Sequence, residues 1–312
     1  MSMEQIFENF VRLEKERDYK IEAVAIADEE KVLLEHHFYP DKVRNIYSHT
    51  KSYMSLAAGI AMDEGKLSLS DKLSDFFPEK LPQNPDERLL RITLRDLLTM
   101  SSGFDECYLM GSGRRSGEGI PDYVRYMLAR PVKQNPGEKF HYSTADSILA
   151  GRMIEKAVGM RLGEYLYGHV FAKLGQGWPL WENDPEGHPV GGGGMHMKLT
   201  DMMKLGQLYL GEGKWKGERI VSREWTKESG SFKISTDGHP EKNVWKCGYG
   251  YQFWMCPYPG SYRADGSYGQ ITAVLPQQGI VVALQCSEEG DFNRTTEFLH
   301  ENLFLPLVEE LS

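Results

Sequence analysis

Residues 47–79 read YSHTKSYMSLAAGIAMDEGKLSLSDKLSDFFPE, and this segment carries the strongest local signals in the chain. Its apolar residues recur at the i, i+3, i+4, i+7 spacing of one helix face and predict a helix over about residues 48–64. They are Met54, Ala57, Ala58 and Ala61. Gly65 follows, at a position where many helices end on a left-handed residue. Ser48 and Lys51 open this helix three positions apart, so their side chains share a face.

A serine and a lysine on one helix face can perform nucleophilic catalysis. A serine hydroxyl becomes a useful nucleophile when a neighbouring base takes its proton. Lys51 can be that base if burial or a second cation lowers its pKa. The helix N-terminus adds backbone N–H groups that favour developing negative charge. A Ser-x-x-Lys pair also occurs at ordinary solvated helix starts, so the pair needs support from the rest of the sequence.

Strand signals lie near both ends of the chain, and helix signals dominate residues 70–190. The expected strands are aromatic or β-branched segments between turns. They lie at 21–38, as two strands around a turn at Asp28–Glu30, and at 248–256, 269–275 and 280–286. Amphipathic helices are expected at about 6–13 and 293–311, close to the two termini.

This order predicts an α+β fold with one antiparallel sheet built from both chain ends. The terminal helices flank the sheet, and a mainly helical region is inserted between its two halves. We expect residues 1–70 and 190–312 to form an α/β sandwich domain and residues 71–189 to form a helical insertion domain. The active site is expected in the cleft between the two domains. The glycine-rich segment GSGRRSGEG at 111–119 is predicted to be a mobile loop at its rim.

Composition excludes several classes of partner. The 312 residues carry 36 Lys and Arg against 45 Asp and Glu, which gives a net charge of −9 and makes nucleic-acid binding a poor hypothesis. No apolar run approaches the ~20 residues that span a bilayer. The N-terminus is charged from the start and has no apolar signal region, so we expect a cytoplasmic protein.

Cysteine and histidine usage gives no sign of a cofactor. Cys107, Cys247, Cys256 and Cys286 form no CxxC pair, and reduced thiols are the simplest expectation. His196 lies between two methionines, but no second histidine or cysteine stands at ligand spacing from it, so no metal site is predicted.

Several further blocks follow residues 47–79 in a recognisable order. They are ITLRDLLTMSSG (92–103), NPGEKFHYSTADSILAGRMIEKAVGM (135–160), GGGGMHMKLTDMMKLGQLYLGEGKWKGERIVSREW (191–225), GYGYQFW (248–254) and ADGSYGQITAVLPQQGIVVAL (264–284). Together these blocks resemble the serine β-lactamase and penicillin-binding-protein superfamily, and most closely its class C-type branch of esterases, amide hydrolases and D-amino peptidases. The resemblance covers about residues 45–290 and implies a β-lactamase-like fold.

The resemblance also implies roles for individual residues. Ser48 would be the acylated nucleophile, and Lys51 and Tyr142 would share the general base and acid work. The backbone amides of Ser48 and Gln270 would form the oxyanion hole. The residues expected to contact substrate are Thr144, Ser267, Tyr268, Gly269 and Trp181. Five aromatic residues would either line an acyl pocket or belong to the core: Trp178, Trp181, Tyr249, Tyr251 and Trp254.

Two departures from the family pattern bear on the substrate. The second motif, usually Tyr-x-Asn, is Tyr142-Ser143-Thr144 here, and a threonine grips a substrate amide less well than an asparagine. Ser267 stands where the third motif often has lysine or histidine, which removes a cation that faces the substrate carboxylate in β-lactamases and cell-wall peptidases. Neutral esters or amides are therefore favoured, unless Arg263, Arg114 or Arg115 restores the positive charge.

The sequence thus predicts a serine hydrolase that acts through an acyl-enzyme on a small ester or amide, including short D-amino-acid peptides or amide oligomers. The alternatives are a β-lactamase or DD-peptidase, an acyltransferase to a metabolite, and a catalytically silent binding protein. The joint presence of Ser48, Lys51 and Tyr142 disfavours the silent protein. No cofactor and no membrane partner are implied, and the oligomeric state is left open.

Overall fold

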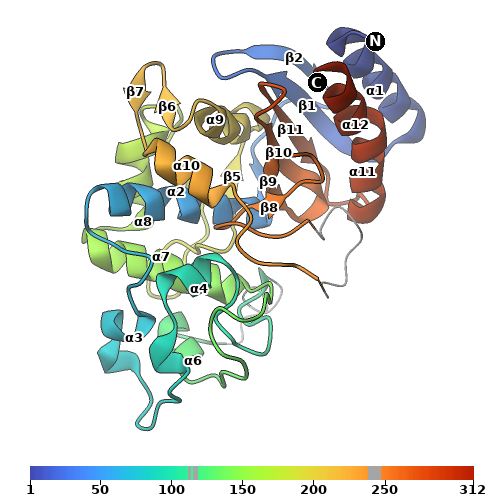
Figure 1. Ribbon diagram of the computed structural model, residues 1–312. Helices are drawn as coiled ribbons and strands as arrows, with labels where there is room; N and C mark the ends of the chain where they lie inside the picture. Colours follow the sequence, from blue (N-terminus) through green and yellow to red (C-terminus); the bar gives the residue numbers. More distant parts are fainter. Residues whose placement is uncertain (112–113, 115–118, 238–246) are drawn as a thin grey trace.

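The computed structural model describes residues 1–111, 114, 119–237 and 247–312 (Figure 1). Its helices are α1 (Met3–Arg17), α2 (Thr50–Asp63), α3 (Leu73–Phe76), α4 (Leu94–Leu98), α6 (Tyr123–Leu128), α7 (Thr144–Val158), α8 (Leu162–Leu166), α9 (Leu199–Leu210), α10 (Arg223–Ser229), α11 (Phe292–Leu299) and α12 (Leu305–Glu310). Its strands are β1 (Ile21–Ala27), β2 (Val32–His37), β3 (Arg44–Asn45), β4 (Leu180–Trp181), β5 (Met195–Met197), β6 (Lys214–Trp215), β7 (Glu218–Arg219), β8 (Trp254–Met255), β9 (Tyr262–Gly266), β10 (Gln270–Leu275) and β11 (Ile280–Cys286).

The main sheet has six strands in the order β2-β1-β11-β10-β9-β8, and its neighbouring strands are antiparallel. The N-terminal β1 pairs with the C-terminal β11, with Val24 opposite Leu284. The prediction of one antiparallel sheet built from both chain ends is therefore confirmed. The pairing also brings the two termini to the same side of the molecule (Figure 1).

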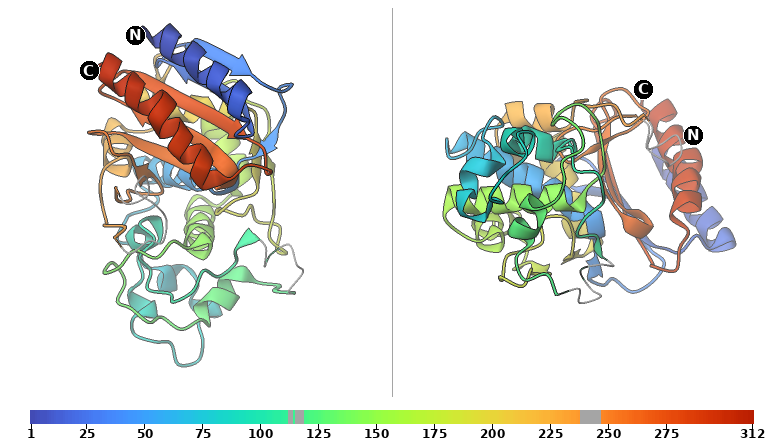
Figure 2. Two further views of the ribbon diagram at one scale, coloured as in Figure 1. Left: turned by 90° about the vertical axis from the view of Figure 1, so that its right-hand side faces the viewer. Right: turned by 90° about the horizontal axis from the view of Figure 1, so that it is seen from below.

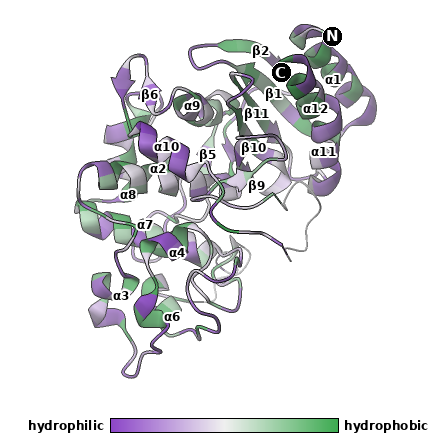
Figure 3. Ribbon diagram, in the orientation of Figure 1, coloured by the Kyte–Doolittle hydropathy of each residue, from purple (hydrophilic) through white to green (hydrophobic). Residues whose placement is uncertain are grey.

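The strands of this sheet use large and small residues on opposite faces. On one face, Val24, Ile26 and their neighbours on β10 and β11 pack against α1, α11 and α12, as Figure 2 shows. On the other face, Ala23 and Ala25 leave room for α9 to lie close to the sheet. The terminal helices carry both hydrophilic and hydrophobic residues, as amphipathic packing on a sheet requires (Figure 3).

Two expected segments differ from the structure. Only Trp254 and Met255 of residues 248–256 form a strand of the main sheet, because the chain reverses at Gln252, whose φ of 63° is left-handed. A strand at Tyr262–Gly266, which periodicity did not predict, provides the neighbour of β10 instead. The short β4 also lies within the part expected to lack strands, where it pairs with β5.

The other expected elements are present with shifted ends. The two strands at 21–38 and the helix near residues 48–64 form, the latter as α2 behind a short 3-10 turn at Tyr47–His49. The C-terminal helix runs from α11 through a π-helical turn at His300–Phe304 into α12. The expected mobile loop at 111–119 lies mostly outside the described residues. No helix among the described residues is long and apolar enough to cross a membrane.

Helix α2 lies at the centre of the largest apolar core. Every residue from Thr50 to Ala61 is buried, and α2 packs against α7 and α8. Gly59 provides the contact with α10, because a Cβ there would lie 2.0 Å from the Trp225 ring. The Trp225 indole donates to the Ser55 carbonyl at 2.9 Å and stacks on Tyr251, so it has little freedom to move.

We therefore expect Gly59→Ala to lower the free energy of unfolding by about 1–3 kcal/mol, because overpacking against a fixed ring outweighs the better helix propensity of alanine. Urea denaturation followed by circular dichroism measures this change. Gly168→Ala is the matched control, since a Cβ at Gly168 meets nothing within 4 Å. It should leave stability within about 1 kcal/mol of the wild type. Equal stability of the two variants would contradict the packing at Gly59.

Candidate active site

Ser48 and Lys51 meet at the turn that opens α2. The Lys51 Nζ lies 3.0 Å from the Ser48 Oγ, and Lys51 is only 1% exposed. The buried His49 ring lies between them in the sequence and hydrogen-bonds with the Thr272 hydroxyl on β10 at 2.8 Å. Burial lowers the pKa of His49 to about 3, so this ring is neutral and anchors the turn to the sheet.

The lysine amine is held by three oxygens. Besides Ser48, it contacts the Gly192 carbonyl at 2.6 Å and the Thr144 hydroxyl at 3.4 Å. Burial first, and the Arg114 charge second, lower the pKa of Lys51 to about 7. An amine with that pKa is largely neutral at mildly alkaline pH and can accept the serine proton. The pair therefore has the geometry and the electrostatics of an activated nucleophile.

Arg114 is held beside the lysine by an ion pair. Its side chain is 4% exposed. Two guanidinium nitrogens each lie 3.2 Å from an oxygen of Glu182, a residue that precedes the glycine-rich segment 191–194 in the chain. A third nitrogen donates to the Leu109 carbonyl at 2.6 Å. From the sequence, Arg114 is only one of three arginines that could provide a positive charge. Its pairing with Glu182 was not predictable, because no sequence motif links two residues that are 68 positions apart.

Tyr142 approaches the same pair from the start of α7. Its ring centroid lies 5.1 Å from the Lys51 Nζ. The ring stacks on Trp254 with centroids 5.4 Å apart. Burial raises the pKa of Tyr142 strongly, and an interaction with the Ser48 hydroxyl opposes that rise only in part. The phenol is therefore protonated at neutral pH and is placed to pass a proton rather than to act as the resting base.

The second motif supports the lysine from the N-terminus of α7. Ser143 caps this helix by accepting from the Asp146 backbone N–H at 3.2 Å. Thr144 is 3% exposed, so its hydroxyl faces Lys51 rather than an open surface. Asp146 is fully buried and accepts from Ser102 at 2.8 Å, and burial raises the pKa of its carboxyl to about 7.

The third motif meets the serine turn at Gly266. A Cβ on Gly266 would lie 2.2 Å from the Ile46 carbonyl and 3.1 Å from the His49 nitrogen. The end of β9 therefore packs directly on the turn that carries Ser48. Ser267 follows at once and is exposed, and the half-buried Tyr268 places its ring 5.2 Å from the Tyr47 ring.

Gly269 and Gln270 pack toward Cys286 on β11. A Cβ on Gly269, whose φ is 96°, would meet the Cys286 sulfur at 2.8 Å. Gln270 is 1% exposed and donates from its side-chain amide to the Cys286 carbonyl at 2.7 Å. The turn Ser267–Gly269 carries the chain from β9 into β10, which begins at Gln270. The role of the Gln270 backbone amide in the oxyanion hole stays a prediction.

Trp181 is a buried support rather than an open wall. It is 9% exposed, and its indole N–H donates to the Val190 carbonyl at 2.9 Å and the Gly193 carbonyl at 3.1 Å. These bonds fix the glycine segment whose Gly192 carbonyl accepts from Lys51. The sequence showed the four glycines but gave no sign that one of their carbonyls would hold the lysine.

Cys107 is a second nucleophilic atom near the site that the sequence did not single out. Its exposed thiol lies 3.6 Å from the His141 Nε2 and donates to the Tyr142 carbonyl at 3.1 Å. Burial of part of the side chain raises the pKa of the thiol. Since the thiolate is the reactive form, this environment favours Ser48 over Cys107 as the nucleophile.

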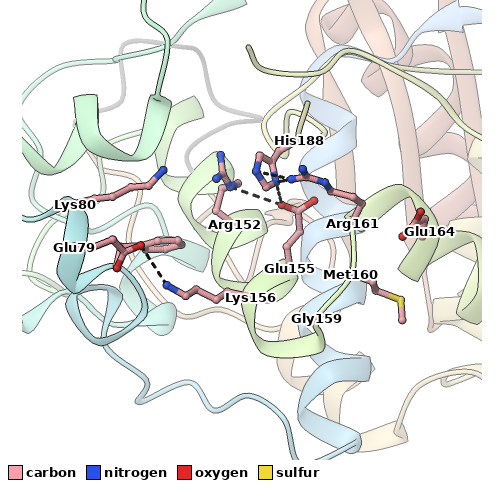
Figure 4. A pocket seen from close by; sticks show the side chains of 11 residues that line it. Glu79, Lys80, Arg152, Glu155, Lys156, Gly159, Met160, Arg161, Glu164 and His188 are labelled. Carbon is pink, nitrogen blue, oxygen red and sulfur yellow. Dashed lines mark hydrogen bonds and ion pairs between the residues drawn. The ribbon is translucent and has the colours of Figure 1, made fainter. Parts of the chain in front are cut away.

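A charged hollow of about 470 Å³ lies beside α7 and includes none of the residues around Ser48 (Figure 4). Several of its charges are paired with one another: Arg152 and His188 contact the Glu155 carboxylate, and Lys156 lies 3.4 Å from Glu79. The described residues contain no group of three or more His, Cys, Asp or Glu side chains placed to hold a metal ion. The site at Ser48 is therefore the stronger candidate for chemistry.

An antiparallel sheet packed on a helical region, with a paired serine and lysine where they meet, defines a serine hydrolase. The chain belongs to the beta-lactamase family, whose model matches residues 7–302. It is 23% identical over 292 residues to the 6-aminohexanoate-dimer hydrolase of Paenarthrobacter ureafaciens, a match that covers 88% of this chain and 74% of the relative.

Two further comparisons agree with the family assignment. The chain is 27% identical over 147 residues to esterase EstB of Burkholderia gladioli, which covers 43% of this chain and 37% of the relative. Its fold superposes on the octameric penicillin-binding protein homologue from Pyrococcus abyssi with a TM-score of 0.73 at 23% identity, covering 98% of this chain and 78% of the other. The predicted β-lactamase-like fold and hydrolase class are confirmed.

The Arg114 charge gives a pH prediction. Lys51 must be neutral to act as base, so kcat/KM should rise with pH through a midpoint near the Lys51 pKa of about 7. Arg114→Gln removes a cation that lowers this pKa, so the midpoint should move up by about half a pH unit or more. The pH profile of ester hydrolysis measures it.

Arg114→Lys is the matched control, because it keeps the positive charge and should keep the midpoint close to that of the wild type. An unchanged midpoint in Arg114→Gln, or a move to lower pH, would show that Arg114 does not set the protonation of Lys51.

Proposed function

We propose that Ser48 attacks the carbonyl carbon of a small ester or amide and forms an acyl-enzyme that water then hydrolyses. The observation that carries this proposal is the buried Lys51 amine 3.0 Å from the Ser48 hydroxyl. Lys51 takes the serine proton, and the Tyr142 phenol, whose ring lies 5.1 Å from the Lys51 Nζ, passes a proton to the leaving group. The same two groups then activate the water that releases the acid.

The oxyanion that forms on attack needs two backbone donors. The Ser48 amide at the start of the α2 turn is one of them. For the second we favour the Ser267 amide over that of Gln270, because Ser267 directly follows Gly266 at the contact with the serine turn. This contact lies within the sheet region, residues 1–70 and 190–312, and Tyr142 and Thr144 reach Lys51 from the helical region, residues 71–189. We propose this division as the domain organisation.

The charges around the site favour a neutral carbonyl substrate. Arg263 is a buried residue of β9, 4% exposed, and its guanidinium is 2.8 Å from the Asp265 carboxylate. The Arg114 guanidinium is paired with the Glu182 carboxylate. Neither of these two arginines replaces the cation missing at Ser267, which a substrate carboxylate would need, and Arg115 lies outside the described residues. Similarity to an amide-dimer hydrolase and an esterase supports a linear amide or ester, and makes a β-lactam or D-Ala-D-Ala substrate the second choice.

Hydrolysis of short-chain p-nitrophenyl esters tests the nucleophile. Ser48→Ala should lower kcat by about 10³-fold or more, because the attacking oxygen is lost. Ser70→Ala changes an exposed serine of a surface turn and should keep full activity. Equal rates for the wild type and Ser48→Ala would remove Ser48 from the chemistry.

A comparison of kcat/KM for different substrates of the wild-type enzyme separates the substrate classes. Uncharged linear amides should be cleaved with higher kcat/KM than nitrocefin or D-Ala-D-Ala peptides, which carry a carboxylate. A preference for the carboxylate-bearing compounds would contradict the neutral-substrate proposal while leaving the nucleophile in place. A product that forms only with an added alcohol or amine acceptor would indicate an acyltransferase.

Tyr142→Phe tests the proton relay separately. The change keeps the ring that stacks on Trp254 and removes only the hydroxyl, so kcat should fall by about 10²–10³-fold while thermal stability changes little. Tyr126→Phe, on α6 beside Arg130, is the control and should stay within about twofold of the wild type. Retention of full activity in Tyr142→Phe would assign the relay to Lys51 alone.

A further inference from the structure

Residues 247–256 form a tight hairpin at the edge of the main sheet. Two backbone bonds define its register: the Gly250 N–H donates to the Phe253 carbonyl at 2.8 Å, and the Met255 N–H donates to the Gly248 carbonyl at 3.0 Å. In an antiparallel pair, hydrogen-bonded and non-hydrogen-bonded positions alternate along the arms. The pair of residues between these two hydrogen-bonded pairs, and the pair that follows Gly248 and Met255 away from the turn, are therefore non-hydrogen-bonded pairs. Side chains at such pairs approach each other closely.

Tyr249 and Trp254 occupy the position between the two bonded pairs, and their rings pack edge to face at 4.9 Å. One step further along both arms, the same register sets Cys247 opposite Cys256. Opposite Cα atoms at such positions are typically about 4.5 Å apart, which lies within the range that a disulfide bridges. The hairpin therefore aligns two thiols that are nine residues apart in the sequence.

Both cysteines line one cavity of about 840 Å³, and each is half-buried. The Arg263 guanidinium lies 3.6 Å from the Cys256 sulfur. Burial raises the pKa of both thiols, and the Arg263 charge opposes the rise at each. The cavity gives a small reagent access to the thiols, and the arginine offsets part of the burial that disfavours the thiolate needed for thiol–disulfide exchange.

We propose that Cys247 and Cys256 are a reversible disulfide site that reacts with low-molecular-mass disulfides. The Cys247 thiolate attacks one sulfur of the reagent, forms a mixed disulfide and releases the first reagent thiol. The Cys256 thiolate then attacks the Cys247 sulfur and releases the second reagent thiol. Two protein thiols are oxidised, one reagent disulfide is reduced, and the two thiol protons leave on the two reagent thiols.

The site goes beyond the proposed hydrolase activity and does not depend on it. Its position gives it a structural consequence, because the hairpin also carries Trp254, on which the Tyr142 ring stacks. A cross-strand bond would close the hairpin and limit its opening. The oxidised protein should therefore be more resistant to heat than the reduced one.

Peptide mapping after exposure of the full chain to 2-hydroxyethyl disulfide tests the proposal. After alkylation under denaturing conditions, we expect one cross-linked peptide pair that contains Cys247 and Cys256 and that dithiothreitol separates. The melting temperature should rise by a few degrees on oxidation and return on reduction. Cys256→Ser should stop at the mixed disulfide on Cys247, and Cys107→Ser should form the cross-link like the wild type.

Mixed disulfides on Cys247 or Cys107 in the wild type, without a Cys247–Cys256 cross-link, would overturn the proposal. So would a cross-link that leaves the melting temperature unchanged or lowers it. The mapping needs neither substrate nor activity, so its result is independent of whether Ser48 is the nucleophile.

Discussion

The burial of one lysine amine is the constraint on which the candidate site depends. Lys51 is 1% exposed, and burial lowers its pKa to about 7. An amine in water would be protonated at that pH and could not accept the serine proton. The elements around Lys51 therefore have to exclude water. They also have to provide oxygens that can accept a hydrogen bond from the lysine amine in its neutral and its charged form. Ser48, Thr144 and the Gly192 carbonyl fill that requirement from three separate parts of the chain.

The fold explains how those parts meet. Pairing of β1 with β11 closes the sheet from both chain ends, and His49 ties the serine turn to β10 through Thr272. The end of β9 then packs on the same turn at Gly266, where a side chain has no room. From the helical side, α7 delivers Thr144 and Tyr142, and Trp181 fixes the glycine segment. The site is thus a junction between the sheet and the helical region.

Local periodicity predicted much of this arrangement. The apolar spacing in residues 48–64 located α2 and placed Ser48 beside Lys51, and the strand signals at both ends predicted the sheet. The contacts that depend on long-range approach were not predictable in the same way. Arg114 meets Glu182 across 68 positions of sequence, and the Gly192 carbonyl reaches Lys51 across 141. The place of Gln270 in the oxyanion hole stays a prediction, because it depends on the turn after β9, which is too short to see in a sequence pattern.

The most direct test of the account is to locate the acyl group on the enzyme. A brief reaction with a short-chain p-nitrophenyl ester, an acid quench and peptide mapping by mass spectrometry would find it. The account predicts one acyl group on the peptide that contains Ser48, at a level that falls as the pH is lowered below the Lys51 pKa of about 7. An acyl group on Cys107, or turnover with no acylated peptide at any pH, would contradict it.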